Sequence, residues 1–175
     1  MNASRSPSST PLSESRITAV PSAQDPDADP SRWASPDYAD GRWPTLHVPQ
    51  IWEAQGLDGL DGVVWYRREV VLDAAQAAMP ATLHLGAIDD CDETWVNGRP
   101  VGKTCVWDQP RHDTLPVGTL REGRNVVAVR VTDTGGAGGF HGDSAAVQLQ
   151  LGAARLPLAG PWKARVETGL DKPEP

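Results

Sequence analysis

The chain has 175 residues, enough for one domain of ordinary size with tails. Its formal net charge of −7 argues against nucleic acids and anionic membranes as partners, because both are recognised through a surplus of Lys and Arg. No stretch approaches the roughly 18 apolar residues of a transmembrane helix, and the N-terminus lacks the apolar core of a signal peptide. Either the protein is cytoplasmic or its export information lies outside this chain.

Changes in composition predict the domain boundaries. Residues 1–30 are rich in Ser, Pro, Ala and Asp, which is typical of a disordered tail or linker. The folded domain is expected to extend over residues 31–168, and residues 169–175 form a polar C-terminal tail.

The first part of the domain, residues 31–62, contains Trp33, Trp43 and Trp52 with turn signals between them. Residues 43–49 are bounded by prolines and predict a short edge strand. We expect this whole region to form a wrap that caps a sandwich.

Regular strands are predicted from residue 63 onward. Residues 73–79 favour at most a turn or two of helix before Pro80. Residues 104–115 are read as irregular, and residues 134–142 as a glycine-rich loop. Short strands, frequent Gly and Pro turns and the lack of a long helical period together predict an all-β antiparallel sandwich. The predicted strands are 63–72, 81–85, 94–96, 100–103, 125–131, 147–151 and 156–166, the last with prolines allowed at a sheet edge.

The segment between predicted strands 81–85 and 94–96, which we call the acidic strand, carries a cluster of carboxylates that a strand does not need in order to fold. Its four carboxylates need solvent, a cation, hydroxyl donors or basic partners. Three interpretations stay open: contact with the hydroxyls of a glycan, ion pairs with arginines such as Arg111 or Arg130, or a calcium site. The cluster consists of Asp89, Asp90, Asp92 and Glu93 and precedes an Asn97-Gly98 turn.

The two cysteines, Cys91 and Cys105, flank this turn. In a hairpin that turns at Asn97-Gly98, Cys91 lies opposite Thr104, and Cys105 is one step out of register on the other face. A bulge near Pro100 could bring the two thiols together. Two free, partly buried thiols are the favoured interpretation.

Several segments resemble one family. They look like the galactose-binding-like jelly roll and, more closely, like the accessory β-domain of bacterial sialate O-acetylesterases and related carbohydrate acetylesterases. The sugar-binding domain of family 2 glycoside hydrolases shares the pattern more loosely. The resemblance covers about residues 33–166 and rests on segments 61–68, 86–98, 107–111, 123–131, 133–142 and 158–163.

The resemblance implies a jelly roll that accompanies a separate hydrolase domain with a Ser-His-Asp site. The family's catalytic Gly-Gln-Ser-Asn block is absent from this sequence, so the chain alone is expected to be noncatalytic. Its parent protein would be a carbohydrate O-acetylesterase, for which a periplasmic or extracellular location is favoured. The implied partners are an oligo- or polysaccharide and an SGNH-type hydrolase domain in cis. The alternative is a purely structural domain that packs on the hydrolase without binding sugar.

Candidate ligand-binding residues follow from the acidic strand and the loops expected near it. An indole face stacks on the apolar face of a pyranose, and neighbouring Asp and Arg side chains fix its hydroxyls. Trp107 could instead plug the end of the core, and Trp95 is ambiguous in the same way, whereas Trp65 and Trp162 favour the core. The candidates are Asp89, Asp90, Trp95, Asn97, Trp107, Asp108, Arg111, Phe140 and His141, with no catalytic residue and no cofactor apart from the calcium alternative.

The segment Gly142-Asp143-Ser144 superficially resembles a serine hydrolase motif. A nucleophilic serine needs a base within hydrogen-bond reach, usually histidine. No histidine follows Ser144 in the chain, although these hydrolases usually place theirs late. We therefore interpret the match as chance.

Overall fold

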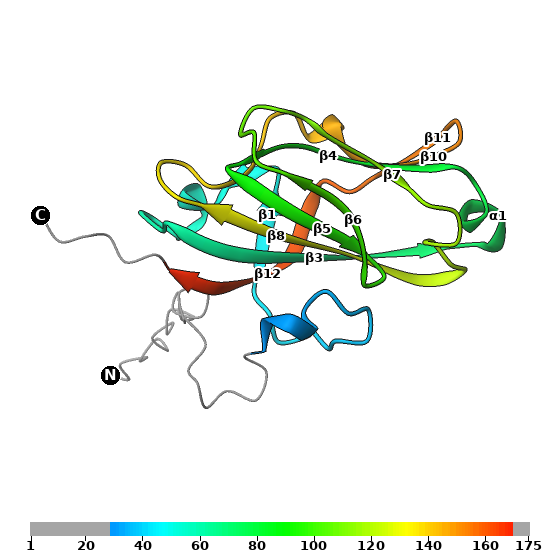
Figure 1. The fold of residues 1–175 in the computed structure, drawn as a ribbon, viewed down its shortest axis with the longest axis horizontal. Helices are drawn as coiled ribbons and strands as arrows, with labels where there is room; N and C mark the ends of the chain where they lie inside the picture. The colour runs from blue at the N-terminus through cyan, green and yellow to red at the C-terminus, as the bar shows by residue number, and fades with distance from the viewer. Residues whose placement is uncertain (1–28, 170–175) are drawn as a thin grey trace, which may run out of the picture.

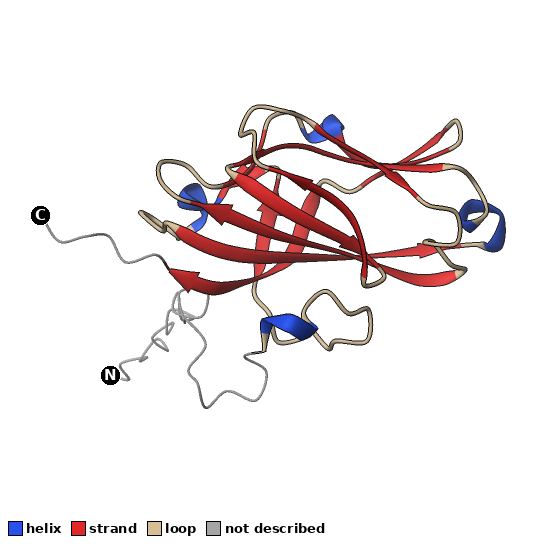
Figure 2. Cartoon of the chain, in the orientation of Figure 1, coloured by secondary structure: helices blue, strands red, loops and turns tan. Residues whose placement is uncertain are grey.

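The computed structural model describes residues 29–169, which form two antiparallel sheets packed face to face (Figures 1 and 2). The predicted all-β jelly-roll sandwich is thus confirmed. The predicted tails lie outside the described residues apart from Asp29, Pro30 and Gly169. The strands are β1 (Thr45–Val48), β2 (Gln50–Ile51), β3 (Gly62–Leu72), β4 (Ala81–Asp89), β5 (Cys91–Val96), β6 (Arg99–Thr104), β7 (Arg111–Leu115), β8 (Gly123–Asp133), β9 (Gly139–His141), β10 (Val147–Leu151), β11 (Ala154–Pro157) and β12 (Gly160–Gly169).

The first sheet has the strand order β1-β12-β3-β8-β5-β6 and the second β11-β10-β4-β9-β2, with β7 also paired to β4. The longest pairing joins β3 to β8, from Gly62 opposite Asp133 to Leu72 opposite Gly123. The helices are α1 (Ala74–Ala77) and the 3-10 turns η1 (Pro30–Arg32), η2 (Trp52–Gln55) and η3 (Ser144–Ala146). None of these helices within residues 29–169 is long enough to cross a membrane.

The main core lies between the sheets because side chains alternate along each strand. In β10, Val147, Leu149 and Leu151 are buried, whereas Gln148 and Gln150 lie on the outer face. Trp162 is buried in this core, as predicted, and its indole donates a hydrogen bond to the Leu158 carbonyl at 2.7 Å.

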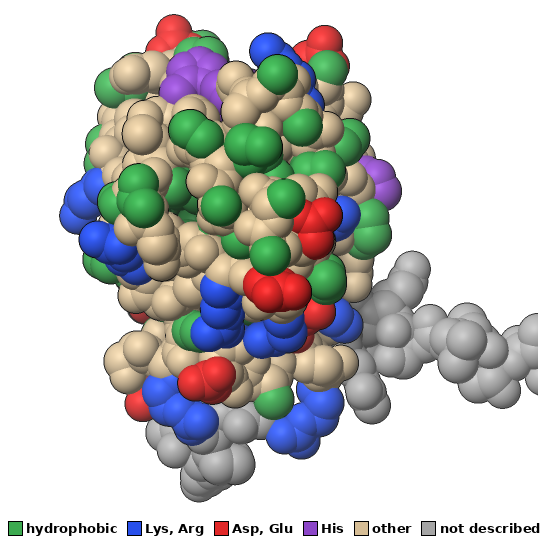
Figure 3. All heavy atoms as spheres, turned by 90° about the vertical axis from the view of Figure 1, so that its right-hand side faces the viewer, with side chains coloured by type: hydrophobic (Ala, Val, Ile, Leu, Met, Phe, Trp, Pro, Cys, Tyr) green, Lys and Arg blue, Asp and Glu red, His purple; other side chains and the backbone are tan. Residues whose placement is uncertain are grey.

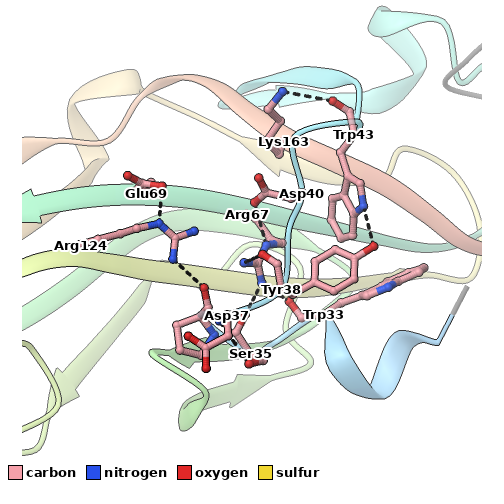
Figure 4. A network of polar contacts seen from close by, with 11 residues as sticks. Trp33, Ser35, Asp37, Tyr38, Asp40, Trp43, Arg67, Glu69, Arg124 and Lys163 are labelled. Carbon is pink, nitrogen blue, oxygen red and sulfur yellow. Dashed lines mark hydrogen bonds and ion pairs between the residues drawn. The ribbon is translucent and has the colours of Figure 1, made fainter. Parts of the chain in front are cut away.

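The wrap over residues 29–44 builds a second core on the outer face of the first sheet (Figure 4). Trp33 and Trp43 pack edge to face with ring centroids 5.2 Å apart, and Trp33 packs in the same way on Trp65. The buried Arg67 guanidinium bonds Asp40 at 2.8 Å and donates to three backbone carbonyls of the wrap, those of Trp33, Ser35 and Tyr38. Of the predicted wrap over residues 31–62, only the part up to residue 44 covers the sheet in this way, fixed by a desolvated cation and by aromatic packing. The remainder contributes β1, β2 and η2 to the sandwich itself.

The sequence-based interpretation of the cysteines as free thiols is wrong, because Cys91 and Cys105 form a disulfide. The register of the β5–β6 hairpin shifts between Thr94 and Trp95, where Thr94 lies opposite Gly102 and Trp95 opposite Pro100. This bulge shifts the pairing register of the two strands by one residue. Extended along the hairpin, the shifted register brings Cys91 opposite Cys105.

Two strands occupy segments that the sequence predicted as irregular or loop, namely β7 and β9. The final predicted strand is two strands: β11 in the second sheet, and β12, which lies between β1 and β3 rather than at an edge. Pro161 is accommodated in β12 opposite His47 of the short β1. The predicted helical turn is α1, where Asp73 and Gln76 form a capping box.

Candidate functional site

One end of the sandwich carries an acidic rim, which we define as Asp89, Asp90 and Asp133 with the loop that follows Asp133. The end of β4 pairs with β9, so that Asp89 lies opposite Gly139 and Ala87 opposite His141. Asp133 is the last residue of β8. Segments far apart in sequence thus bring their carboxylates to one place.

The three carboxylates of the rim are close enough to interact directly. One oxygen from each of Asp89, Asp90 and Asp133 lies within 4.8 Å of the others. Asp90 accepts hydrogen bonds from the backbone N–H and the hydroxyl of Thr134, both at 3.0 Å. Asp133 is fully buried and accepts one hydrogen bond from Gly135 N–H, while its second oxygen has no partner.

The pKa values of the three carboxyl groups shift in different directions. Burial, followed by the neighbouring Asp90, raises the pKa of Asp89 to about 6. The backbone N–H of Thr134 lowers the pKa of Asp90. Burial also raises the pKa of Asp133 to about 6. The rim therefore favours added hydroxyl donors or a cation, and the calcium interpretation of this cluster stays a prediction.

An exposed tryptophan is held beside the rim. The Trp107 side chain is 57% exposed, and its ring stacks on His141 with centroids 6.1 Å apart and planes inclined by 26°. His141 Nε2 donates a hydrogen bond to the Trp107 carbonyl at 2.8 Å. The positive charge that His141 can carry lowers the pKa of Asp89, so His141 acts on both the indole and the acids.

Arg111 is not at the surface. Its guanidinium is buried and pairs with Asp92 at 2.7 Å. It also donates to the carbonyls of Val106 at 2.6 Å, Gln109, and Ile88 at 2.8 Å. The expectation that Arg111 contacts a ligand conflicts with this burial. Arg111 instead anchors the loop that presents Trp107. The ion-pair interpretation holds for Asp92 and also for Glu93, whose carboxylate lies 3.3 Å from Lys103 Nζ and 3.9 Å from Arg130 Nη1.

Two other candidates also have structural surroundings. Phe140 is fully buried and packs edge to face on Tyr66, so its ring does not reach the rim surface. Asn97 lies in the β5–β6 turn, where its amide donates to the Thr119 carbonyl at 2.9 Å and accepts from Val126 N–H at 2.9 Å. Asp108 is exposed in the loop beside Trp107.

Trp95 lies away from the rim, on the outer face of the first sheet. It stacks on the buried Trp65 with ring centroids 5.1 Å apart. Arg130, Glu93 and Glu167 line the same hollow, whose volume is about 300 Å³. The Arg130 guanidinium binds Glu167 through Nε at 2.8 Å and Nη2 at 3.0 Å. The predicted candidates therefore do not form a single site.

The glycine-rich loop is anchored as well as exposed. Gly138 N–H donates to both Glu53 carboxylate oxygens at 3.1 Å, and its carbonyl accepts from Trp52 N–H at 2.9 Å. A Cβ at Gly138 would overlap the Trp52 ring, so this approach requires glycine. Asp133, the rim residue that the sequence analysis missed, could have been noticed because it ends a run of alternating valines directly before this loop.

Ser144 is placed in a turn rather than beside a base. It opens η3, which Asp143 caps through a hydrogen bond from Ala145 N–H at 2.9 Å. The nearest histidine in sequence, His141, is engaged with the Trp107 carbonyl.

The fold is that of a β-sandwich which also occurs within family 2 glycoside hydrolases. A family 2 member from Bacteroides cellulosilyticus DSM 14838 is 21% identical over 61% of this chain and 17% of its own, with a TM-score of 0.53. A family 2 β-glucuronidase is 21% identical over 62% of this chain and 13% of its own length, with a TM-score of 0.54. The Bacteroides uniformis β-glucuronidase is 19% identical over 78% of this chain and 16% of its own length, with a TM-score of 0.50.

At these identities the likeness shows the fold alone. The chain spans less than a fifth of the length of each of these enzymes. No protein-family model and no curated protein sequence matches this chain.

Proposed function

We propose that this chain is a noncatalytic carbohydrate-binding domain whose contact surface is the acidic rim together with its indole. The observation that carries the proposal is the exposed Trp107, which is held by His141 beside Asp89 and Asp90. Asp108 lies in the same exposed loop as Trp107. Arg111 and Phe140, both buried, support this surface from behind.

The chemistry of the rim suits a sugar ring. A pyranose presents an apolar face of C–H groups that packs on an indole, and hydroxyls around its edge that donate to carboxylates. Asp90 keeps its acceptor character because the Thr134 backbone favours its ionised form. A cation is not required for either contact.

We infer further that the parent protein is a carbohydrate O-acetylesterase with an SGNH-type hydrolase domain in cis. This step rests on the sequence motifs, including the segment from Asp133 to the glycine-rich loop. The structural relatives are glycoside hydrolases by name, which supports carbohydrate chemistry in general and leaves the type of parent enzyme to experiment. Sequence on either side of this reading frame, with or without a Gly-Gln-Ser-Asn block, decides the point.

Titration of the purified chain with plant and animal oligosaccharides, followed by NMR shifts and calorimetry, tests the sugar-binding proposal. We expect Trp107→Ala to lower the affinity by roughly tenfold or more, because stacking on an aromatic ring contributes about 1–3 kcal/mol in comparable ring contacts. Trp95→Ala is the matched control, since it removes an indole from the outer face of the first sheet, away from the rim. No response to any sugar, or equal losses in both variants, would overturn the proposed rim.

The structural alternative also has an observation in its favour. An apolar groove of about 670 Å³ lies at the opposite end of the sandwich, beside α1, where hydrophobic side chains gather (Figure 3). Val117 is fully exposed and Met79 is 50% exposed at this groove. If the groove packs on the hydrolase domain, Val117→Asp should weaken that complex and leave sugar titrations unchanged.

A further inference from the structure

Two histidines face each other on the outer face of the second sheet. His84 of β4 and His112 of β7 are directly opposite in the antiparallel register. Their Nδ1 atoms are 2.5 Å apart, and their rings lie edge to face with centroids 4.7 Å apart. His112 is exposed and His84 half-buried, so solvent reaches the pair.

A chain of hydrogen bonds fixes the proton positions. The Gln150 amide nitrogen donates to the Gly152 carbonyl at 3.3 Å, which turns the Gln150 amide oxygen toward His84. That oxygen is 2.9 Å from His84 Nε2, so Nε2 carries the proton and Nδ1 keeps its lone pair. His112 Nδ1 must then be the donor in the contact between the two rings.

This arrangement is that of a histidine prepared as a metal ligand. Histidines that bind metals usually donate their second N–H to a carbonyl, carboxylate or water, which fixes the tautomer and the ring orientation. In His84 the Gln150 amide oxygen fills that role. Two neutral imidazoles on adjacent strands suit Zn²⁺, Cu²⁺ and Ni²⁺, whereas Ca²⁺ and Mg²⁺ prefer oxygen.

We propose that His84 and His112 form a two-histidine site for a first-row transition-metal dication. Both Nδ1 atoms bind the ion, and the remaining coordination positions face solvent. Two nitrogens bound to one ion at about 2.0–2.1 Å each lie about 3 Å apart. The exposed His112 ring therefore has to move outward by roughly half an ångström and turn, so that both Nδ1 lone pairs point at the ion.

The proton count does not change on binding. His112 gives up its Nδ1 proton and takes one on the exposed Nε2, so it stays neutral, and His84 keeps its proton on Nε2.

The test uses the 175-residue chain without a histidine tag, titrated with CuCl₂ at pH 7.5. Paramagnetic broadening in a ¹⁵N NMR spectrum should begin at β4 and β7, and electron paramagnetic resonance should show imidazole nitrogen as a ligand. His84→Gln and His112→Gln should each abolish the tightest binding event. Gln150→Ala, which removes only the orienting partner, should weaken it by about 10–100-fold.

His47→Gln is the matched control, because His47 is an exposed histidine on β1 of the other sheet. It should leave the titration unchanged. Asp89→Asn separates this site from the acidic rim and should also bind copper normally. Copper that binds equally well to His84→Gln and His112→Gln, or broadening that begins at the rim or at the N-terminus, would overturn the proposal.

Discussion

Single charged residues inside the sandwich set limits on what its surface can do. Asp113 of β7 faces the first sheet, where its carboxylate fills the space that a Cβ at Gly102 would need. One of its oxygens is buried without a partner. Burial first, and then Asp92, raises the pKa of Asp113 to about 6, although Arg111 opposes this shift. Ionising Asp113 therefore costs more free energy in the folded protein than in the unfolded chain.

The pH dependence follows from this sign. In the unfolded chain Asp titrates near 3.9, so the native state holds this proton more tightly and the free energy of unfolding falls as pH rises from about 4 to about 6. Asp113→Asn removes this titrating group and therefore the fall in the free energy of unfolding. We expect the variant to gain roughly 1–2 kcal/mol over the wild type at pH 7.5, after allowance for solvent screening, and almost nothing at pH 4.

Urea unfolding at the two pH values measures this difference. Asp58→Asn is the matched control because it removes the same charge from an exposed loop. A gain from Asp113→Asn that is the same at both pH values, or a loss at pH 7.5, would contradict the argument.

At the level of strands, the sequence predicts those in which every second residue is apolar. It misses those in which the inward-facing residues are charged. β10 and β8 are found because Val and Leu recur at every second residue. β7 is missed because two of its three inward positions are Arg111 and Asp113. β9 is missed because it has three residues and lies in a glycine-rich segment.

The candidate site follows the same rule. The resemblance implies that the acidic strand lies at the rim of the sandwich. In the structure Asp89 and Asp90 lie at one end of the sandwich, where the β4–β9 pairing adds His141. The resemblance cannot tell which neighbours turn inward. Phe140 and Arg111 do so because the alternation of their short strands points them into the core.

The disulfide joins two elements that both serve the rim. Cys91 begins β5 next to Asp90, and Cys105 begins the loop that carries Trp107. The bridge closes a loop between cysteines 14 positions apart, for which loop entropy gives about 3 kcal/mol. We expect Cys91→Ser/Cys105→Ser to lose an amount of this order in urea unfolding, and ¹⁵N relaxation to show faster motion at Trp107. Since Arg111 also anchors this loop, unchanged relaxation would mean that Arg111 alone is sufficient.

The molecule as a whole consists of a sandwich and a wrap that share one sheet. The wrap buries Trp33 and Trp43 against the outer face, and this second core contacts the sandwich through Trp65. Arginines are among the residues that join the two layers. Arg67 is fully buried, whereas Arg124 bonds Glu69 at 2.6 Å and the Pro36 carbonyl at 2.6 Å from a partly exposed position (Figure 4).

These two arginines predict different costs. Arg67→Ala leaves Asp40 and three carbonyls of the wrap without their donor, and breaking a buried ion pair costs about 3–5 kcal/mol. Arg124→Ala removes an exposed pair and should cost about 1 kcal/mol or less. Because Arg67 contacts the wrap from within the sheet, its loss should release residues 29–44 before the sandwich unfolds.

Limited trypsin digestion under native conditions measures this release, since Arg32 and Arg42 are the cleavage points inside the wrap. We expect Arg67→Ala to be cut there much faster than the wild type, with Arg124→Ala close to the wild type. Far-UV circular dichroism of the uncut Arg67→Ala protein should stay that of a β-sandwich, which separates release of the wrap from global unfolding. Equal cleavage rates in all three proteins would show that aromatic packing, rather than the buried guanidinium, fixes the wrap to the sheet.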